Sequence, residues 1–204
     1  ESIGRTTAVG GNIRALVRDG WGFVSFNNLD ELPAKVELAV KQARLVGKGE
    51  SRLAAVEPVV ATVPAQTDKN PVAVPLAEKK QLLDEYNDII WHTPKLQTSV
   101  ISYGDSHKKV IFLSSSGSYI GQERADITLR LTAVATEGNE VQQTGLSLGS
   151  RGDFSLIQGR HQQIKQMAQH AVELLSAPQV KGGEYTVVLD PVLAGVFVHE
   201  AFGH

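Results

Sequence analysis

The sequence has no cysteine among its 204 residues. A disulfide scaffold is therefore excluded, and so is a metal site built on thiolates of this chain. Aromatic residues make up only 6%, and the formal net charge is −2, from 20 basic and 22 acidic residues. This balance gives no electrostatic reason to expect nucleic acid or a membrane as partner. The 42% of hydrophobic residues can bury a core, which excludes global disorder.

Long apolar runs are also missing. The run near the end of the chain, from Val192 to Val198, covers about seven residues, whereas a membrane-spanning helix needs about 20. The first residues do not have the pattern of a signal peptide. We therefore expect no membrane partner and a cytoplasmic location. The chain has no initiator Met, and we expect it to be part of a longer protein whose C-terminal half is absent.

Alternation of apolar and polar residues predicts several strands. It is strongest in residues 125–136, where Ile127, Leu129 and Leu131 alternate with polar residues. The other strands are expected as a hairpin in residues 12–26 with its turn at Asp19-Gly20, a hairpin in residues 96–117 with its turn around Gly104–Lys108, a glycine-broken pair in residues 140–157, and a single strand at Tyr185–Leu189.

Helical spacing of apolar residues predicts helices over residues 30–47, 76–92, 161–176 and 191–204. For the last helix, Asp190 is the expected N-cap and Pro191 the first helical residue. Together the strands and helices predict an α+β fold, with an antiparallel or mixed sheet and three to four packing helices.

Proline content divides the chain into three parts. Residues 1–48 form an N-terminal hairpin plus helix, and residues 49–75 form a connector with four prolines, which excludes a helix there. Residues 76–204 form an α+β segment that ends in the last helix. We expect the three parts to belong to one N-terminal domain of the longer protein.

The chain ends in an HExxxH motif, with His199, Glu200 and His204. Imidazoles are good ligands for zinc and similar metals, and a neighbouring carboxylate can take a proton from a metal-bound water. Histidines five residues apart lie about 140° apart around a regular helix, too far for one metal. The spacing therefore predicts a helix that loses its hydrogen-bond pattern near Phe202–Gly203, where glycine permits the distortion.

The setting of the motif supports a metal. The preceding helix is apolar, so we expect Glu200 to be buried, where an uncompensated charge is costly. A buried carboxylate of this kind usually has a partner such as a metal-bound water.

The segment LDPVLAGVFVHEAFGH, preceded by GGEYTVV, resembles the TldD/PmbA family of metalloproteases, on the catalytic TldD side, as does RDGWGFVSFN in residues 18–27. This family was once described as modulators of DNA gyrase. The resemblance implies that His199 and His204 are metal ligands and that Glu200 is the general base. It also implies a third ligand, a cysteine, from the absent C-terminal half, so this chain alone is expected to be inactive.

The expected function is therefore that of a metal-dependent peptidase, with zinc or another divalent metal as cofactor, that hydrolyses unfolded or leader peptides. The resemblance implies a TldE/PmbA-type partner subunit, and a homo-oligomer is the other possibility. Two alternatives stay open. One is a non-catalytic partner subunit that binds and presents peptide by strand addition, which the intact Glu200 argues against. The other is a small-molecule metallohydrolase.

Overall fold

The structure is a computed structural model that describes residues 1–203, with Ser150 described by its backbone alone. It divides into two compact units, Glu1–Pro58 and Val59–His204. The described residues form four α-helices and six strands in an antiparallel and a mixed sheet. This confirms the predicted α+β fold class.

The first unit is a β-hairpin covered by a helix. Strands β1 (Gly11–Val17) and β2 (Gly20–Phe26) pair antiparallel, and the turn lies at Asp19-Gly20 as predicted. Helix α1 (Leu32–Val46) then packs on the hairpin. The predicted hairpin and helix are therefore both confirmed.

Small residues let α1 approach the hairpin at backbone distance. A Cβ atom built on Gly22 would lie 1.8 Å from the carbonyl oxygen of Ala39, and one on Gly20 would lie 2.2 Å from that of Ala43. Ala39 and Ala43 are fully buried. Any larger residue at either glycine would force the helix away from the sheet.

The second unit is built on a four-stranded sheet. Strand β5 (Tyr119–Glu137) lies inside the sheet and pairs antiparallel with β4 (Leu96–Leu113) on one side. On its other side it pairs antiparallel with β6 (Glu140–Arg151) and, near its start, parallel with the short β3 (Val60–Val63). The sheet is therefore mixed, and β5 joins all of its strands.

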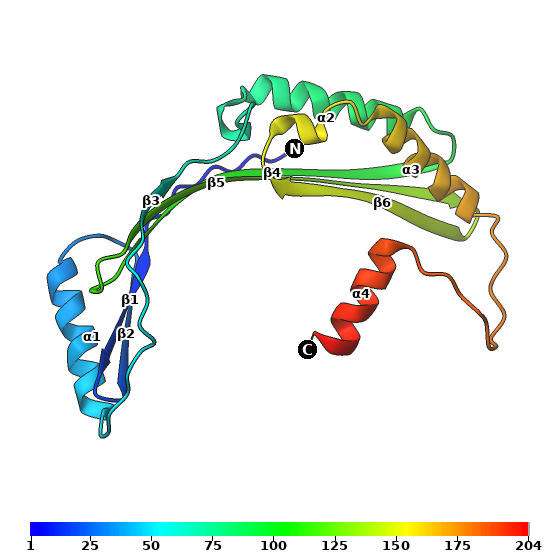
Figure 1. Cartoon of the computed structure of the whole chain (residues 1–204). Coiled ribbons are helices and arrows are strands. Elements are labelled where there is room, and N and C mark those ends of the chain that lie inside the picture. Colours follow the sequence, from blue (N-terminus) through cyan, green and yellow to red (C-terminus); the bar gives the residue numbers. More distant parts are fainter. Residues whose placement is uncertain (204) are drawn as a thin grey trace. The chain divides into compact units, whose positions relative to one another are not determined.

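Two helices cover one face of this sheet (Figure 1). They are α2 (Leu76–Trp91) and α3 (His161–Leu174), close to their predicted positions, and each follows a short 3-10 turn, η1 (Pro71–Ala73) or η2 (Phe154–Ile157). The residues of β5 that face the helices are buried: Ala125, Ile127, Leu129, Leu131, Ala133 and Ala135. The apolar positions of the predicted alternation are therefore the core positions of this strand.

The predicted turn around Gly104–Lys108 is wrong. β4 continues through these residues without a break, and the chain reverses instead between Ser114 and Ser118, where Gly117 has a φ of 100°. Glycine at position 104 leaves room for the neighbouring strand, because a Cβ atom there would lie 3.1 Å from the Thr128 side-chain oxygen. Residues that are typical of turns therefore lie inside a strand here, because contacts with the neighbouring strand favour them at these positions.

The glycine-broken strand pair expected in residues 140–157 is also wrong. β6 is one strand of 12 residues, and Gly145 and Gly149 lie within its register opposite Thr132 and Thr128. A Cβ atom on Gly145 would lie 3.2 Å from the carbonyl oxygen of Leu131. These glycines therefore reflect close packing on the sheet surface.

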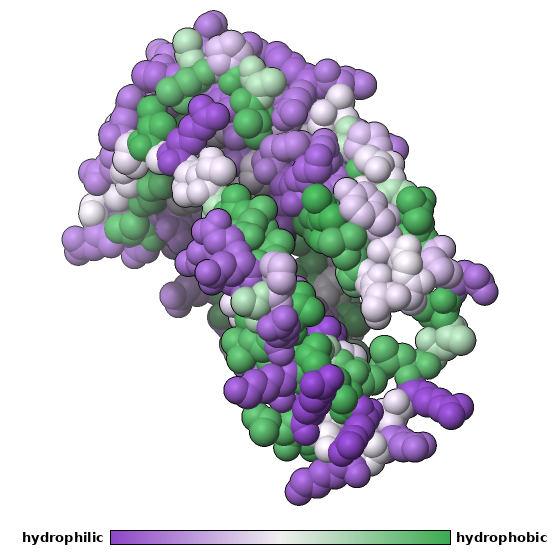
Figure 2. Space-filling model, turned by 90° about the vertical axis from the view of Figure 1, so that its left-hand side faces the viewer, coloured by the Kyte–Doolittle hydropathy of each residue, from purple (hydrophilic) through white to green (hydrophobic). Residues whose placement is uncertain are grey.

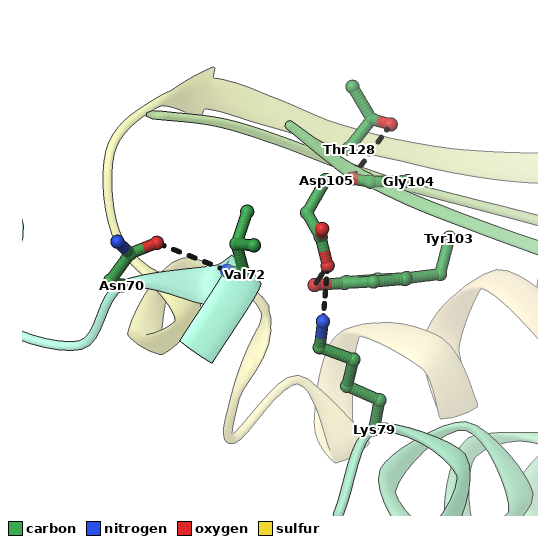
Figure 3. A network of polar contacts seen from close by, with 7 residues as sticks. All are labelled: Asn70, Val72, Lys79, Tyr103, Gly104, Asp105 and Thr128. Carbon is green, nitrogen blue, oxygen red and sulfur yellow. Dashed lines mark hydrogen bonds and ion pairs between the residues drawn. The ribbon is translucent and has the colours of Figure 1, made fainter. Parts of the chain in front are cut away.

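A charged cluster lies between α2 and β4 (Figure 3). The Lys79 ammonium donates to Asp105 Oδ2 at 2.5 Å, and the Tyr103 hydroxyl donates to the same oxygen at 2.5 Å. The side chains of Lys79 and Asp105 are only 11% and 16% exposed. Burial, together with the bond to Asp105, raises the pKa of Tyr103 far above its usual value. One carboxylate therefore satisfies both buried donors.

We predict that Asp105→Ala lowers the free energy of unfolding by about 2–4 kcal/mol, because it leaves an ammonium and a hydroxyl without their acceptor in a mostly dry site. Urea denaturation measures this loss. The matched control is Asp84→Ala, which breaks the exposed pair of Asp84 with Lys80 on α2 and should cost under about 0.5 kcal/mol. Equal losses in the two variants would contradict the assigned role of Asp105.

Candidate metal centre

The segment that leads to the HExxxH motif is extended and unpaired. The strand predicted at Tyr185–Leu189 is wrong, because no described residue pairs with this segment. Val188 is 98% exposed and Val187 is 68% exposed. The sequence has strand character, but a strand forms only where a neighbouring strand accepts its hydrogen bonds.

The helix that carries the motif begins as predicted. Helix α4 runs from Pro191 to Phe202, and the Asp190 carboxylate accepts the backbone N–H of Leu193 at 2.8 Å. Pro191 occupies the first turn, where its missing N–H costs nothing. The predicted N-cap and helix start are therefore confirmed.

Helix α4 is exposed in this chain, and the burial expected for Glu200 is not observed in it. Its apolar side chains are exposed: Val192, Leu193, Val196, Phe197, Val198 and Phe202. Figure 2 shows one face of the molecule, on which hydrophobic groups stand beside hydrophilic ones. A helix that is apolar on all sides is normally enclosed by other elements, and no described element encloses α4.

The end of α4 differs from the prediction of a break near Phe202–Gly203. The N–H of Gly203 still donates to the carbonyl oxygen of His199 at 2.8 Å, and Gly203 has a helical conformation with a φ of −92°. A Cβ atom on Gly203 would lie 2.6 Å from that carbonyl oxygen. Glycine is therefore needed at this position for close approach to His199, and not for a positive φ.

Of the three predicted site residues, two are described. His199 and Glu200 lie next to each other in the last turns of α4, and both side chains are exposed. His204 lies outside the described residues. Among residues 1–203, no three His, Asp or Glu side chains come together as a metal-ligand set.

The donor chemistry nevertheless suits a divalent metal. An imidazole is a ligand that zinc accepts, and a carboxylate beside it can act on a metal-bound water. The described part of the motif supplies one imidazole, which is not a complete ligand set.

Two other histidines lie beside carboxylates in a way that the sequence did not indicate. His107 Nε2 is 3.6 Å from Glu123, and His161 Nε2 is 3.4 Å from Glu85. The partners are far apart in sequence, so only the pairing of β4 with β5 and the packing of α2 beside α3 reveal them. Neither pair has a third metal-ligating side chain beside it among residues 1–203, so neither provides a ligand set.

The fold is that of solved proteins described as putative modulators of DNA gyrase. The protein from Bacteroides thetaiotaomicron superposes with a TM-score of 0.71 at 18% identity, over 95% of this chain and 46% of that one. The protein from Thermotoga maritima gives a TM-score of 0.65 at 13% identity, over 84% of this chain and 39% of that one. At these identities the likeness defines the fold alone.

Sequence comparison defines the family. Residues 69–177 match the family described as PmbA/TldA metallopeptidase central domain, and residues 1–44 match PmbA/TldA metallopeptidase domain 1. The chain therefore belongs to the PmbA/TldD metallopeptidase family. The expected resemblance is confirmed.

Curated relatives carry the same description. A metalloprotease of Synechocystis is 40% identical over the whole chain, and a metalloprotease of Methanothermobacter thermautotrophicus is 32% identical over 97% of it. The chain spans 44% and 43% of these two proteins, less than half of their length. None of the helices in residues 1–203 is both long and apolar enough to cross a membrane.

Proposed function

We propose that this chain is the N-terminal part of a metal-dependent peptidase whose metal is held by His199 and His204 and whose general base is Glu200. The observation that carries the proposal is the capped helix α4, which presents the HExxxH motif at its end in a chain of a metallopeptidase family. We expect zinc, since imidazole ligands suit it and an adjacent carboxylate suits hydrolysis.

The metal, when bound, supplies Lewis-acid polarisation of the peptide carbonyl. Glu200 then takes a proton from the attacking water at a carboxylate oxygen and returns it to the leaving amine nitrogen. His199 and Glu200 are adjacent in α4, so the helix fixes base and ligand relative to each other. The hydrogen bond from Gly203 to His199 holds this last turn in shape.

The third ligand and the cover for α4 must both come from polypeptide outside residues 1–203. The relatives are more than twice as long as this chain, and α4 is apolar and exposed. We infer that the additional polypeptide encloses α4 and supplies the third ligand, which family resemblance suggests is a cysteine.

The proposed substrates are unfolded or leader peptides, and the proposed partner is a TldE/PmbA-type subunit or a second copy. A cytoplasmic location is proposed as well. Each of these statements extends the peptidase proposal and depends on it.

We predict that Glu200→Gln in the full-length protein keeps the metal but lowers peptidase activity at least about 100-fold, as expected on loss of a general base. Turnover of a fluorogenic peptide and metal analysis of the same sample measure the two effects. The control is Glu57→Gln, an exposed carboxylate before Pro58, which should leave both unchanged. Near-normal turnover by metal-loaded Glu200→Gln would refute the role of Glu200.

We also predict that Gly203→Ala in the full-length protein weakens metal binding at least about tenfold, because the new Cβ atom must displace the carbonyl of His199. Competition with a zinc-binding dye measures the affinity. The control is Gly182→Ala in the segment before α4, since a Cβ atom there meets nothing within 4 Å. The proposed arrangement is wrong if both variants bind metal like the wild type.

A further inference from the structure

The face of the β4–β5–β6 sheet opposite α2 and α3 carries a group of basic side chains. Along β5 this open face presents Arg124, Asp126 and Arg130, because they alternate with the buried residues. In the register of the sheet, Lys108 of β4 lies beside Arg124, and Arg151 of β6 lies beside Asp126. These strands therefore place four cations and one anion on one face.

Three of these cations have no counter-ion in the part of the chain that the structure describes. Arg124 donates to Asp126 at 2.8 Å, which neutralises one pair. Among the described residues, no carboxylate pairs with Lys108, Arg130 or Arg151. On the helix-covered face, by contrast, Lys79 is paired with Asp105. Three cations of the open face are thus available to an anionic ligand.

The residues between the cations are small and polar or are glycines. Arg130 has Ser102 on one side and Ser147 on the other. Two residues along β5, Thr128 lies between Gly104 and Gly149, and a Cβ atom on either glycine would touch Thr128. No side chain therefore flanks Thr128 on either neighbouring strand, whereas serine hydroxyls flank Arg130.

We propose that this open face binds an extended, acidic polypeptide segment, which makes acidic stretches a feature of the substrates. The proposal rests on the peptidase function proposed above and adds a substrate class to it. The Arg130 row and the Arg151 row are four residues apart along β5, about 13 Å at the rise of a strand. Carboxylates at positions i and i+4 of an extended peptide have the same separation.

The charge pattern favours a polypeptide over a nucleic acid. The whole chain has a net charge of −2, so it offers no broad field for a polyanion. The three unpaired cations instead stand at separate positions along strands, where single carboxylates can form charge-assisted hydrogen bonds. Serine and threonine hydroxyls beside them can donate to the same carboxylates.

The test uses the full-length protein with Glu200→Gln, so that binding is measured without turnover. The probe is a fluorescein-labelled 12-residue peptide with Glu at alternate positions, and its partner peptide has Gln at those positions. Fluorescence anisotropy gives both affinities. Arg130→Gln and Arg151→Gln are compared with Lys165→Gln, which removes the same charge from an exposed position on α3. Thermal unfolding verifies that each variant is folded.

We expect the acidic peptide to bind at least about tenfold more tightly than the Gln peptide. Arg130→Gln and Arg151→Gln together should remove most of this preference, while Arg130→Lys and Lys165→Gln retain it. Equal affinity for the two peptides, equal loss in Lys165→Gln, or stronger competition by single-stranded DNA would overturn the proposal. Because binding needs neither metal nor catalysis, failure of the peptidase mechanism would leave this result interpretable.

Discussion

Strand β5 is the element on which the second unit depends. Every other strand of that sheet pairs with it, and its buried face supplies the core against α2 and α3. The period of two in a strand sends alternate residues to opposite faces. The same 19 residues therefore build an apolar core on one side and a basic, hydroxyl-rich surface on the other. A shift of one residue in register would exchange the two faces.

Helix α4 follows a different rule. It has its own N-cap and an intact hydrogen bond at its last turn, so its ends are locally defined. Its apolar side chains, however, have no described partner. The local signals thus form the helix, and in our proposal its environment depends on polypeptide outside residues 1–203. The candidate metal centre shares that dependence, since the described part supplies too few ligands.

Periodicity in the sequence was enough to predict the core positions of β5 and the positions of the helices. The alternation in residues 125–136, the helical spacing in α2 and α3, and the Asp190-Pro191 start of α4 were all confirmed. Glycine was misleading where it serves packing: Gly104 and Gly145 lie inside strands because a neighbouring strand needs the space. Local sequence cannot distinguish that use of glycine from a turn, because the reason lies in a distant segment.

The candidate site divides in the same way. Its residue types and its helix were visible in sequence, because a motif and an N-cap are local. The conformation of Gly203 was not visible in sequence, because the spacing of the histidines requires a bend before His204 only if both bind one metal. The structure keeps a helical bond at Gly203.

The most direct test of the proposed metal centre is a metal-bound crystal structure of the complete protein. We expect His199 and His204 to coordinate one ion, with ring nitrogens about 2.1 Å from it if it is zinc. Glu200 should lie close enough to reach a water beside the ion. A structure in which only one of these histidines contacts the metal, or in which Glu200 points away from it, would contradict the account.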